Sequence, residues 1–195
     1  MKYNSIKKTI VSCLHSFSSI ITQANKEFIQ FTGFSKDELL GKSLLEIEAM
    51  LRINSQIHLD NISVKYSGYI FTKALEAREM NISLFHNTVT NEEVYSFVEK
   101  PNSRLEDKMI FVKQMFTDNI SGVAIHSILD LTLLKANQKY LDFMDSPFKE
   151  QQNSIGSSIR KIINGFEGSK AEEIWNTVVE TQKTSYVKEF ATDSF

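Results

Sequence analysis

Hydrophobic and polar residues alternate most regularly between residues 79 and 86. There the apolar Met80, Ile82 and Leu84 are separated by single polar residues. This period of two is the pattern of a strand with one buried face. Further strands are expected at residues 69–72 and 94–99, with a polar turn at 90–93. The second half of the first hundred residues therefore predicts three antiparallel strands.

Before these strands the pattern changes to a helical one. An apolar strand ends at Ala24, and the spacing of Phe28 and Phe31 then predicts a helix. Asn25 is well placed to cap its first turn. Gly33 supplies the left-handed residue that ends it. The next short helix is expected to begin with a capping box at residues 35–38.

The chain repeats this pattern once. Residues 20–31 match residues 132–143, so that Asn137 follows Asn25 at an offset of 112. Residues 41–47 match residues 156–162 at an offset of 115. Tyr140 and Phe143 take the places of Phe28 and Phe31, and Ser146-Pro147 is expected to start the next helix. A domain-sized period indicates a duplicated domain rather than a solenoid.

The repeat divides the chain into residues 1–101, a helical linker at 102–118, and an incomplete second copy at 119–195. Tyr186 matches Tyr69, so the last two strands of the first copy have no counterpart before Phe195. We therefore expect a fragment whose output module lies further on. In the linker, four apolar residues are spaced as in a short coiled-coil seam, or as a stripe that packs on its own sheet: Leu105, Met109, Val112 and Phe116.

The sequence Ala24-Asn25-x-x-Phe28-Ile29-x-Phe31, followed by residues 33–43 (GFSKDELLGKS), resembles the PAS family. The resemblance covers residues 11–99 and, more loosely, about 122–195. It implies an α+β fold with two PAS-like domains, each a five-stranded antiparallel sheet with short helices on one face, the second truncated. Residues 69–104 also resemble sensor regions of histidine kinases from low-GC Gram-positive bacteria.

A ligand pocket in such a domain is expected between the concave sheet face and the helices. Seven residues are candidates to line it: Phe28, Phe31, Met80, Ile82, Leu84, Ser96 and Val98. The same residues are equally expected as the core of a domain that binds no ligand. The charged residues 76–79 are interpreted as a solvated turn rather than a salt bridge. Trp175, on an amphipathic helix at about 169–182, is expected to pack in a core.

Composition excludes several classes. The net charge is −2, and Lys and Arg do not gather, so nucleic acid is not an expected partner. No apolar run reaches the roughly 18 residues of a membrane span. A single cysteine, Cys13, indicates a reducing cytoplasm. The four histidines lack metal-ligand spacing and kinase-box context, no phosphate-binding loop is present, and haem, flavin and catalytic residues are not expected.

These observations lead to the hypothesis of a sensory and dimerisation module of a signalling protein, a histidine kinase whose catalytic part lies downstream. It is expected to form homodimers through the PAS domains and the linker helix. The alternative is a ligand-free PAS scaffold that binds other proteins. An enzyme is least favoured, because the strand pattern places no acid inside an apolar pocket.

Overall fold

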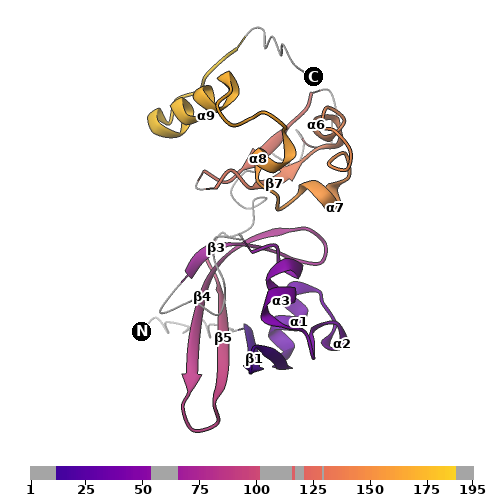
Figure 1. Ribbon diagram of the computed structural model, residues 1–195, viewed down its shortest axis with the longest axis vertical. Helices are drawn as coiled ribbons and strands as arrows, with labels where there is room; N and C mark the ends of the chain where they lie inside the picture. Colours follow the sequence, from indigo (N-terminus) through magenta and orange to yellow (C-terminus); the bar gives the residue numbers. More distant parts are fainter. Residues whose placement is uncertain (1–11, 54–65, 102–115, 117–120, 129, 188–195) are drawn as a thin grey trace, which may run out of the picture.

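A computed structural model describes residues 12–53, 66–101, 116, 121–128 and 130–187. Two regions are stacked along its long axis (Figure 1). We call residues 12–101 the first region and residues 121–187 the second region. The predicted linker lies outside the described residues, except for Phe116.

The first region contains one antiparallel sheet of five strands. In chain order these are β1 (Ser12–Phe17), β2 (Ile20–Ala24), β3 (Tyr66–Phe71), β4 (Ala77–Asn87) and β5 (Glu92–Glu99). Their spatial order is β2-β1-β5-β4-β3, so β1 pairs with β5 at the centre. The predicted α+β class, the alternating strand and its two neighbours are confirmed.

Three short helices connect β2 to β3: α1 (Lys26–Thr32), α2 (Lys36–Leu39) and α3 (Leu44–Met50). Their ends follow from local chemistry, as predicted. The Asn25 side chain accepts a hydrogen bond from Phe28 N, and Gly33 ends α1 with φ +76°. Ser35 and Glu38 form the expected capping box of α2, and an unpredicted second box joins Ser43 to Glu46 at α3.

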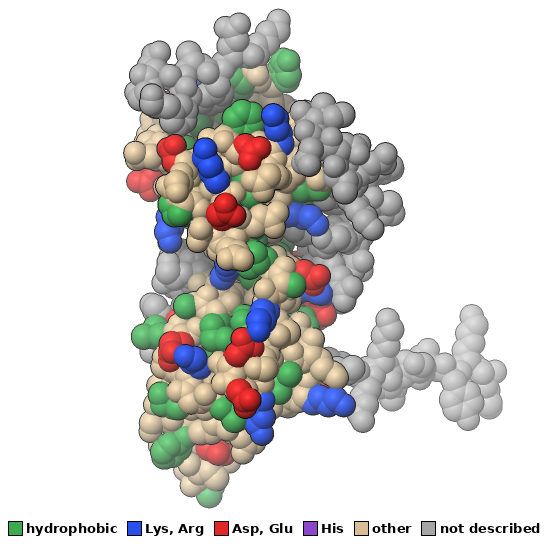
Figure 2. All heavy atoms as spheres, turned by 90° about the vertical axis from the view of Figure 1, so that its right-hand side faces the viewer, with side chains coloured by type: hydrophobic (Ala, Val, Ile, Leu, Met, Phe, Trp, Pro, Cys, Tyr) green, Lys and Arg blue, Asp and Glu red, His purple; other side chains and the backbone are tan. Residues whose placement is uncertain are grey.

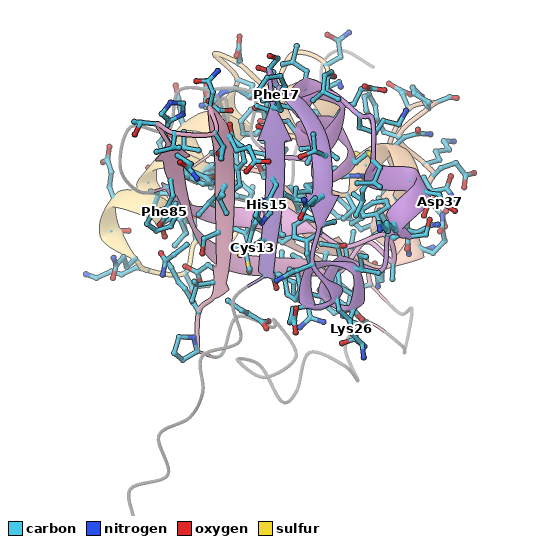
Figure 3. All side chains as sticks on the ribbon, turned by 90° about the horizontal axis from the view of Figure 1, so that it is seen from below. Cys13, His15, Phe17, Lys26, Asp37 and Phe85 are labelled. Atoms are coloured by element: carbon cyan, nitrogen blue, oxygen red, sulfur yellow. The ribbon has the colours of Figure 1, made fainter. Side chains whose placement is uncertain are left out.

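The core of the first region lies between these helices and one face of the sheet. The rings of Phe28 and Phe97 meet edge to face at 5.1 Å. Fully buried side chains fill the space around them: Leu14, Leu39, Ile47, Leu51, Ile70, Met80, Ile82 and Tyr95. The opposite face of the sheet is not covered by α1, α2 or α3 (Figure 3).

The second region has two paired strands among its described residues, β6 (Ala124–His126) and β7 (Leu133–Ala136). The helices α6 (Gln138–Leu141), α7 (Gln151–Ser154), α8 (Ile159–Ile162) and α9 (Lys170–Thr181) follow. Residues 186–189 would repeat the strand at 69–72; of these only Tyr186 and Val187 are described, they form no strand, and Tyr186 is 83% exposed. The amphipathic helix predicted at about 169–182 is confirmed as α9, and Ser169 caps its first turn.

Backbone hydrogen bonds follow the sequence repeat between the two regions. Asn25 N donates to Cys13 O, and Asn137 N donates to Val123 O. The bond from Gly41 N to Ile21 O is matched by one from Gly156 N to Leu133 O, at 2.9 and 2.8 Å. Bonds from Ile21 N to Lys42 O and from Leu44 N to Ser19 O also recur, from Leu133 N to Ser157 O and from Ile159 N to Leu131 O.

The second predicted helix start in this region is wrong. Ser146-Pro147 does not begin a helix, because Phe148 N donates to Asp145 O and closes a turn around the pair. The helix α7 begins only at Gln151, and its N-cap residue Glu150 makes no side-chain capping bond. A serine before a proline is equally suited to a turn and to a helix start.

Candidate functional site

The structure brings five of the seven pocket candidates together. Phe28, Met80 and Ile82 are fully buried in the first core, and Phe31 and Leu84 pack against them. Residues at i and i+3 share one face of α1, and residues at i and i+2 share one face of β4. These two faces pack against each other. Whether a ligand enters among them stays a prediction.

Ser96 and Val98 lie on the other face of the sheet. In the register of β4 and β5, Ile82 is opposite Phe97 and Leu84 is opposite Tyr95, whereas Ser96 is opposite Ser83. Residues directly opposite in an antiparallel pair share a face. The core residues of β5 are therefore Tyr95 and Phe97, which the sequence prediction missed. Pairing the strand with the alternating pattern of β4 would have identified these two residues.

The outer face of the sheet carries aromatic residues in the open. Cys13, His15 and Phe17 lie along β1, with Phe85 nearby (Figure 3). Phe17 is 48% exposed and Phe85 is 61% exposed. Exposed aromatic side chains on the sheet face opposite α1, α2 and α3 are a suitable contact surface for another protein.

A polar cluster lies on the concave side at the start of β5, where Ser16 of β1 pairs with Glu93. Ser16 is fully buried, and its hydroxyl donates to Glu93 Oε2 at 3.0 Å. The hydroxyl of the buried Tyr95 donates to the same oxygen, also at 3.0 Å. The Glu93 carboxylate thereby satisfies two polar groups that burial has removed from water.

Arg78 corrects the interpretation of residues 76–79 as a solvated turn. Its side chain is 9% exposed and forms ion pairs with Glu76 and with Glu99, the latter at 3.1 Å. Its guanidinium carbon lies 5.9 Å from the centre of the Phe31 ring. Because residues 78, 80 and 82 share one strand face, Arg78 closes the end of the concave surface beside α1. Its Nε is buried and has no hydrogen-bond partner among the described residues.

The two regions meet at the end of the β3–β4 hairpin, a contact we call the junction. Phe71 and Ala77 from the first region are buried in one apolar cluster with residues of the second. Those residues are Leu133, Leu134, Ala136, Leu141, Met144, Ile155 and Ile162. The junction is thus a shared hydrophobic core rather than a surface touch.

Arg52, just after α3, adds a polar tie to the junction. Its guanidinium donates to the main-chain carbonyls of Gln152, at 2.7 Å, and Ile155. Burial lowers the pKa of this guanidinium. Gly156 lies against the same side chain, since a Cβ on it would be 2.6 Å from Arg52 Cδ. Its φ of +82° also favours glycine.

Three hollows surround the loop of residues 72–76 between β3 and β4. One of about 250 Å³ lies at the junction, between Leu75 and Ile155. Two others, of about 430 and 530 Å³, lie on either side of Lys73. The loop is held by an ion pair of 2.6 Å between Lys73 and Glu38, which with the Ser35 cap keeps the pKa of Glu38 at about 2.

In the second region, His126 lies between two aromatic rings. It meets Trp175 of α9 at 5.0 Å and Tyr140 at 6.2 Å, both edge to face. Burial lowers the pKa of His126, although a hydrogen bond with the Leu131 carbonyl opposes this. Trp175 packs against Phe166 as well, yet none of the residues of α9 is fully buried. Trp175 was expected to lie in a core; it packs against a buried cluster but is itself only partly buried.

Of the four predicted linker residues, Leu105, Met109 and Val112 lie outside the described part of the chain. Phe116 is described, and Lys135 Nζ lies 5.5 Å from its ring centre. Within the described ranges, no three His, Cys, Asp or Glu side chains are grouped as metal ligands. The helices of those ranges are too short or too polar to cross a bilayer. On the face in Figure 2, basic and acidic side chains are interspersed.

Comparisons with known proteins give structural neighbours but no sequence relative. No family model and no curated protein matches the chain. The PAS domain of an HTR-like protein from Haloarcula marismortui is similar over 48% of this chain and 87% of its own, at 17% identity and a TM-score of 0.36. A variant of the protein RsLOV, d2, is similar over 57% and 70%, at 16% identity and a TM-score of 0.38. Likenesses this distant carry no conclusion about function.

Proposed function

We propose that the chain is a sensory and interaction module of the PAS type. The strand order β2-β1-β5-β4-β3, with α1–α3 inserted between β2 and β3, carries the proposal. The order along the chain, two strands, three short helices and three antiparallel strands, is the one that the resemblance of residues 24–43 implies. The module feeds a histidine kinase in the same longer protein, as the resemblance of residues 69–104 suggests.

Two surfaces support roles for this module. The concave core ends at the buried Arg78 and the Ser16–Glu93–Tyr95 cluster, polar groups suited to orient a small molecule. The outer sheet face exposes Phe17 and Phe85, which suits a homodimer contact. A protein-binding scaffold without a ligand is the second candidate. It is favoured by the core itself, because the large side chains of Phe28, Tyr95 and Phe97 are fully buried in one cluster and fill the space that a ligand would occupy.

Native and then denaturing mass spectrometry of the purified chain distinguishes these functions. A sensor with an occupied core gives a dimer that releases a small molecule on denaturation. Phe28→Trp, which enlarges a core side chain, should then lower the bound fraction at least tenfold. Phe143→Trp is the control, since it makes the same change at an exposed phenylalanine outside the first core. A bare dimer in both forms supports the scaffold. A bare monomer contradicts both proposals.

A further inference from the structure

The end of the β3–β4 hairpin has two buried faces. Ile70 is fully buried in the first core, whereas its neighbour Phe71 is 1% exposed in the cluster of the second region. On β4, Met80 likewise faces the first core and Ala77 faces the second region. Successive residues of a strand point to opposite sides. The same pair of strands is therefore a wall of both cores.

The two regions do not depend equally on this wall. The first region has a complete five-stranded sheet and a helical layer of its own. The second region has a two-stranded sheet among its described residues, and two strands alone are marginally stable. Its main buried cluster includes Phe71, the largest fully buried side chain in it. The second region thus takes part of its core from the first.

Arg52 holds the same contact from the polar side. The carbonyls of Gln152 and Ile155 belong to the end of α7, where main-chain oxygens lack partners inside the helix. The half-buried guanidinium donates to both at once through its two terminal nitrogens, which its planar group holds in a fixed geometry. Gly156 leaves the space that the Arg52 side chain fills.

From these contacts we infer that the surface formed by Phe71, Ala77 and Arg52 is an interaction surface whose partner is the second region of the same chain. The second region requires the first for its folded structure, and Arg52 latches it in place. The first region does not require the second. This dependence goes beyond the proposed function and holds whether or not the first core binds a ligand.

The chain provides one reporter in each region for a test by urea unfolding. Trp175 is its single tryptophan and lies in the second region, so tryptophan fluorescence reports that region alone. Cys13 is its single cysteine and lies on β1, so its rate of reaction with a thiol reagent reports the first region. In the unmodified chain, the Trp175 transition should occur at or below the urea concentration of the Cys13 transition. A Trp175 transition at higher urea would overturn the dependence.

Substitutions at two neighbouring residues of β3 should give different results. Phe71→Ala should lower the Trp175 midpoint by about 1 M urea or more and shift the Cys13 midpoint by less than a third as much. Ile70→Ala should lower both midpoints together, because loss of the first region removes the wall of the second. If Trp175 keeps its native fluorescence after Cys13 becomes fully reactive in Ile70→Ala, the inference is wrong. An unchanged Trp175 midpoint in Phe71→Ala also overturns it.

Arg52→Met tests the latch while keeping the apolar stem of the side chain. It should lower the Trp175 midpoint by about 0.5 M urea and leave the Cys13 midpoint in place. The matched control is Arg160→Met, because Arg160 forms its ion pairs with Glu167 and Glu172 inside the second region. That change should shift Trp175 by much less, since these pairs are exposed. An equal effect of the two substitutions would contradict a special role for Arg52.

Discussion

The first and second regions share backbone hydrogen bonds but differ in the side chains that close their helices. Ser35 and Ser43 each form a complete capping box in the first region. At the equivalent positions, Glu150 and Ser158 make no capping bond. Lys161 stands in the repeat where Glu46 stands in the first region, so the backbone N–H of Ser158 lacks the carboxylate that accepts from Ser43 N. The backbone arrangement therefore persists where the local caps have been lost.

The same comparison extends to the aromatic pairs. Phe28 is fully buried against Phe97, while its equivalent Tyr140 contacts His126 instead. Phe31 packs on the first core, while Phe143 is 73% exposed. A complete sheet gives both aromatic residues of α1 a surface to pack against. The second region lacks that surface among its described residues and uses the junction.

The largest expected difference concerns these aromatic positions. Phe28→Ala should lower the free energy of unfolding by about 3–5 kcal/mol, because it removes a fully buried ring. Phe143→Ala should change it by less than about 0.5 kcal/mol. Urea unfolding followed by circular dichroism measures both. Comparable losses at the two positions would show that Phe143 has a packing role equivalent to that of Phe28 and break the comparison.

The asparagines should behave alike, because their geometry is conserved. Asn25 Oδ1 accepts from Cys13 N and Phe28 N, and Asn137 Oδ1 accepts from Val123 N and Tyr140 N. Replacing either by alanine removes a cap and the acceptor of a second backbone N–H, a loss of about 2 kcal/mol in each case.

Aspartate at position 137 should not restore this stability. Asn137 is buried, and its Nδ2 donates to Ser121 O at 2.7 Å. A carboxylate there would face that carbonyl oxygen and would carry a buried charge. Unfolding of Asn137→Ala and Asn137→Asp at neutral pH tests this. Full recovery with aspartate would contradict the geometry described for the second cap.

The caps themselves should differ by a smaller amount. Ser43→Ala should cost about 1 kcal/mol, since Ser43 Oγ accepts from Glu46 N. Ser158→Ala should cost less than about 0.5 kcal/mol. Lys161→Glu places an acidic residue three after Ser158 and should stabilise the second region by a few tenths of a kcal/mol. A loss of stability in Lys161→Glu would show that this helix start cannot form the box.

The smallest expected effect is a dependence on pH in the second region. The folded state lowers the pKa of His126 below its ordinary value of 6.5, so the unfolded chain binds a proton more readily. The stability that neutral His126 contributes is present above pH 6.5 and is lost as the pH falls below that value. The urea midpoint reported by Trp175 should therefore decrease as the pH is lowered from about 7.5 to about 5.5, and His126→Phe should reduce this decrease. An identical pH dependence in His126→Phe would exclude His126 as its source.

Local chemistry explains what could be predicted from the sequence. The caps at Asn25, Ser35 and Asn137 depend on residues within three positions, and the strand at 79–86 depends on its own alternation. The face of Ser96 and Val98 was predicted wrongly because both alternating sets of β5 contain apolar residues. Only the pairing with β4 decides between them.

Long-range contacts explain what could not. Arg52 donates to main-chain carbonyls about a hundred residues away, and such acceptors leave no pattern in the sequence. Arg78 lies in a charge-rich stretch typical of a solvated turn, yet the register of β3, β4 and β5 buries it beside Phe31. The role of Phe71 in the second core likewise depends on a neighbour that periodicity within β3 does not identify.

Hydrogen–deuterium exchange of matched backbone amides tests most directly the claim that the two regions share one backbone arrangement. The amides to compare are Ile21 with Leu133, Asn25 with Asn137, Gly41 with Gly156, and Leu44 with Ile159, because each pair makes the same bond. We predict that both members of every pair are protected more than about 100-fold over the unstructured rate. Protection confined to the amides of residues 21–44, with unprotected exchange at 133, 137, 156 and 159, would contradict the account.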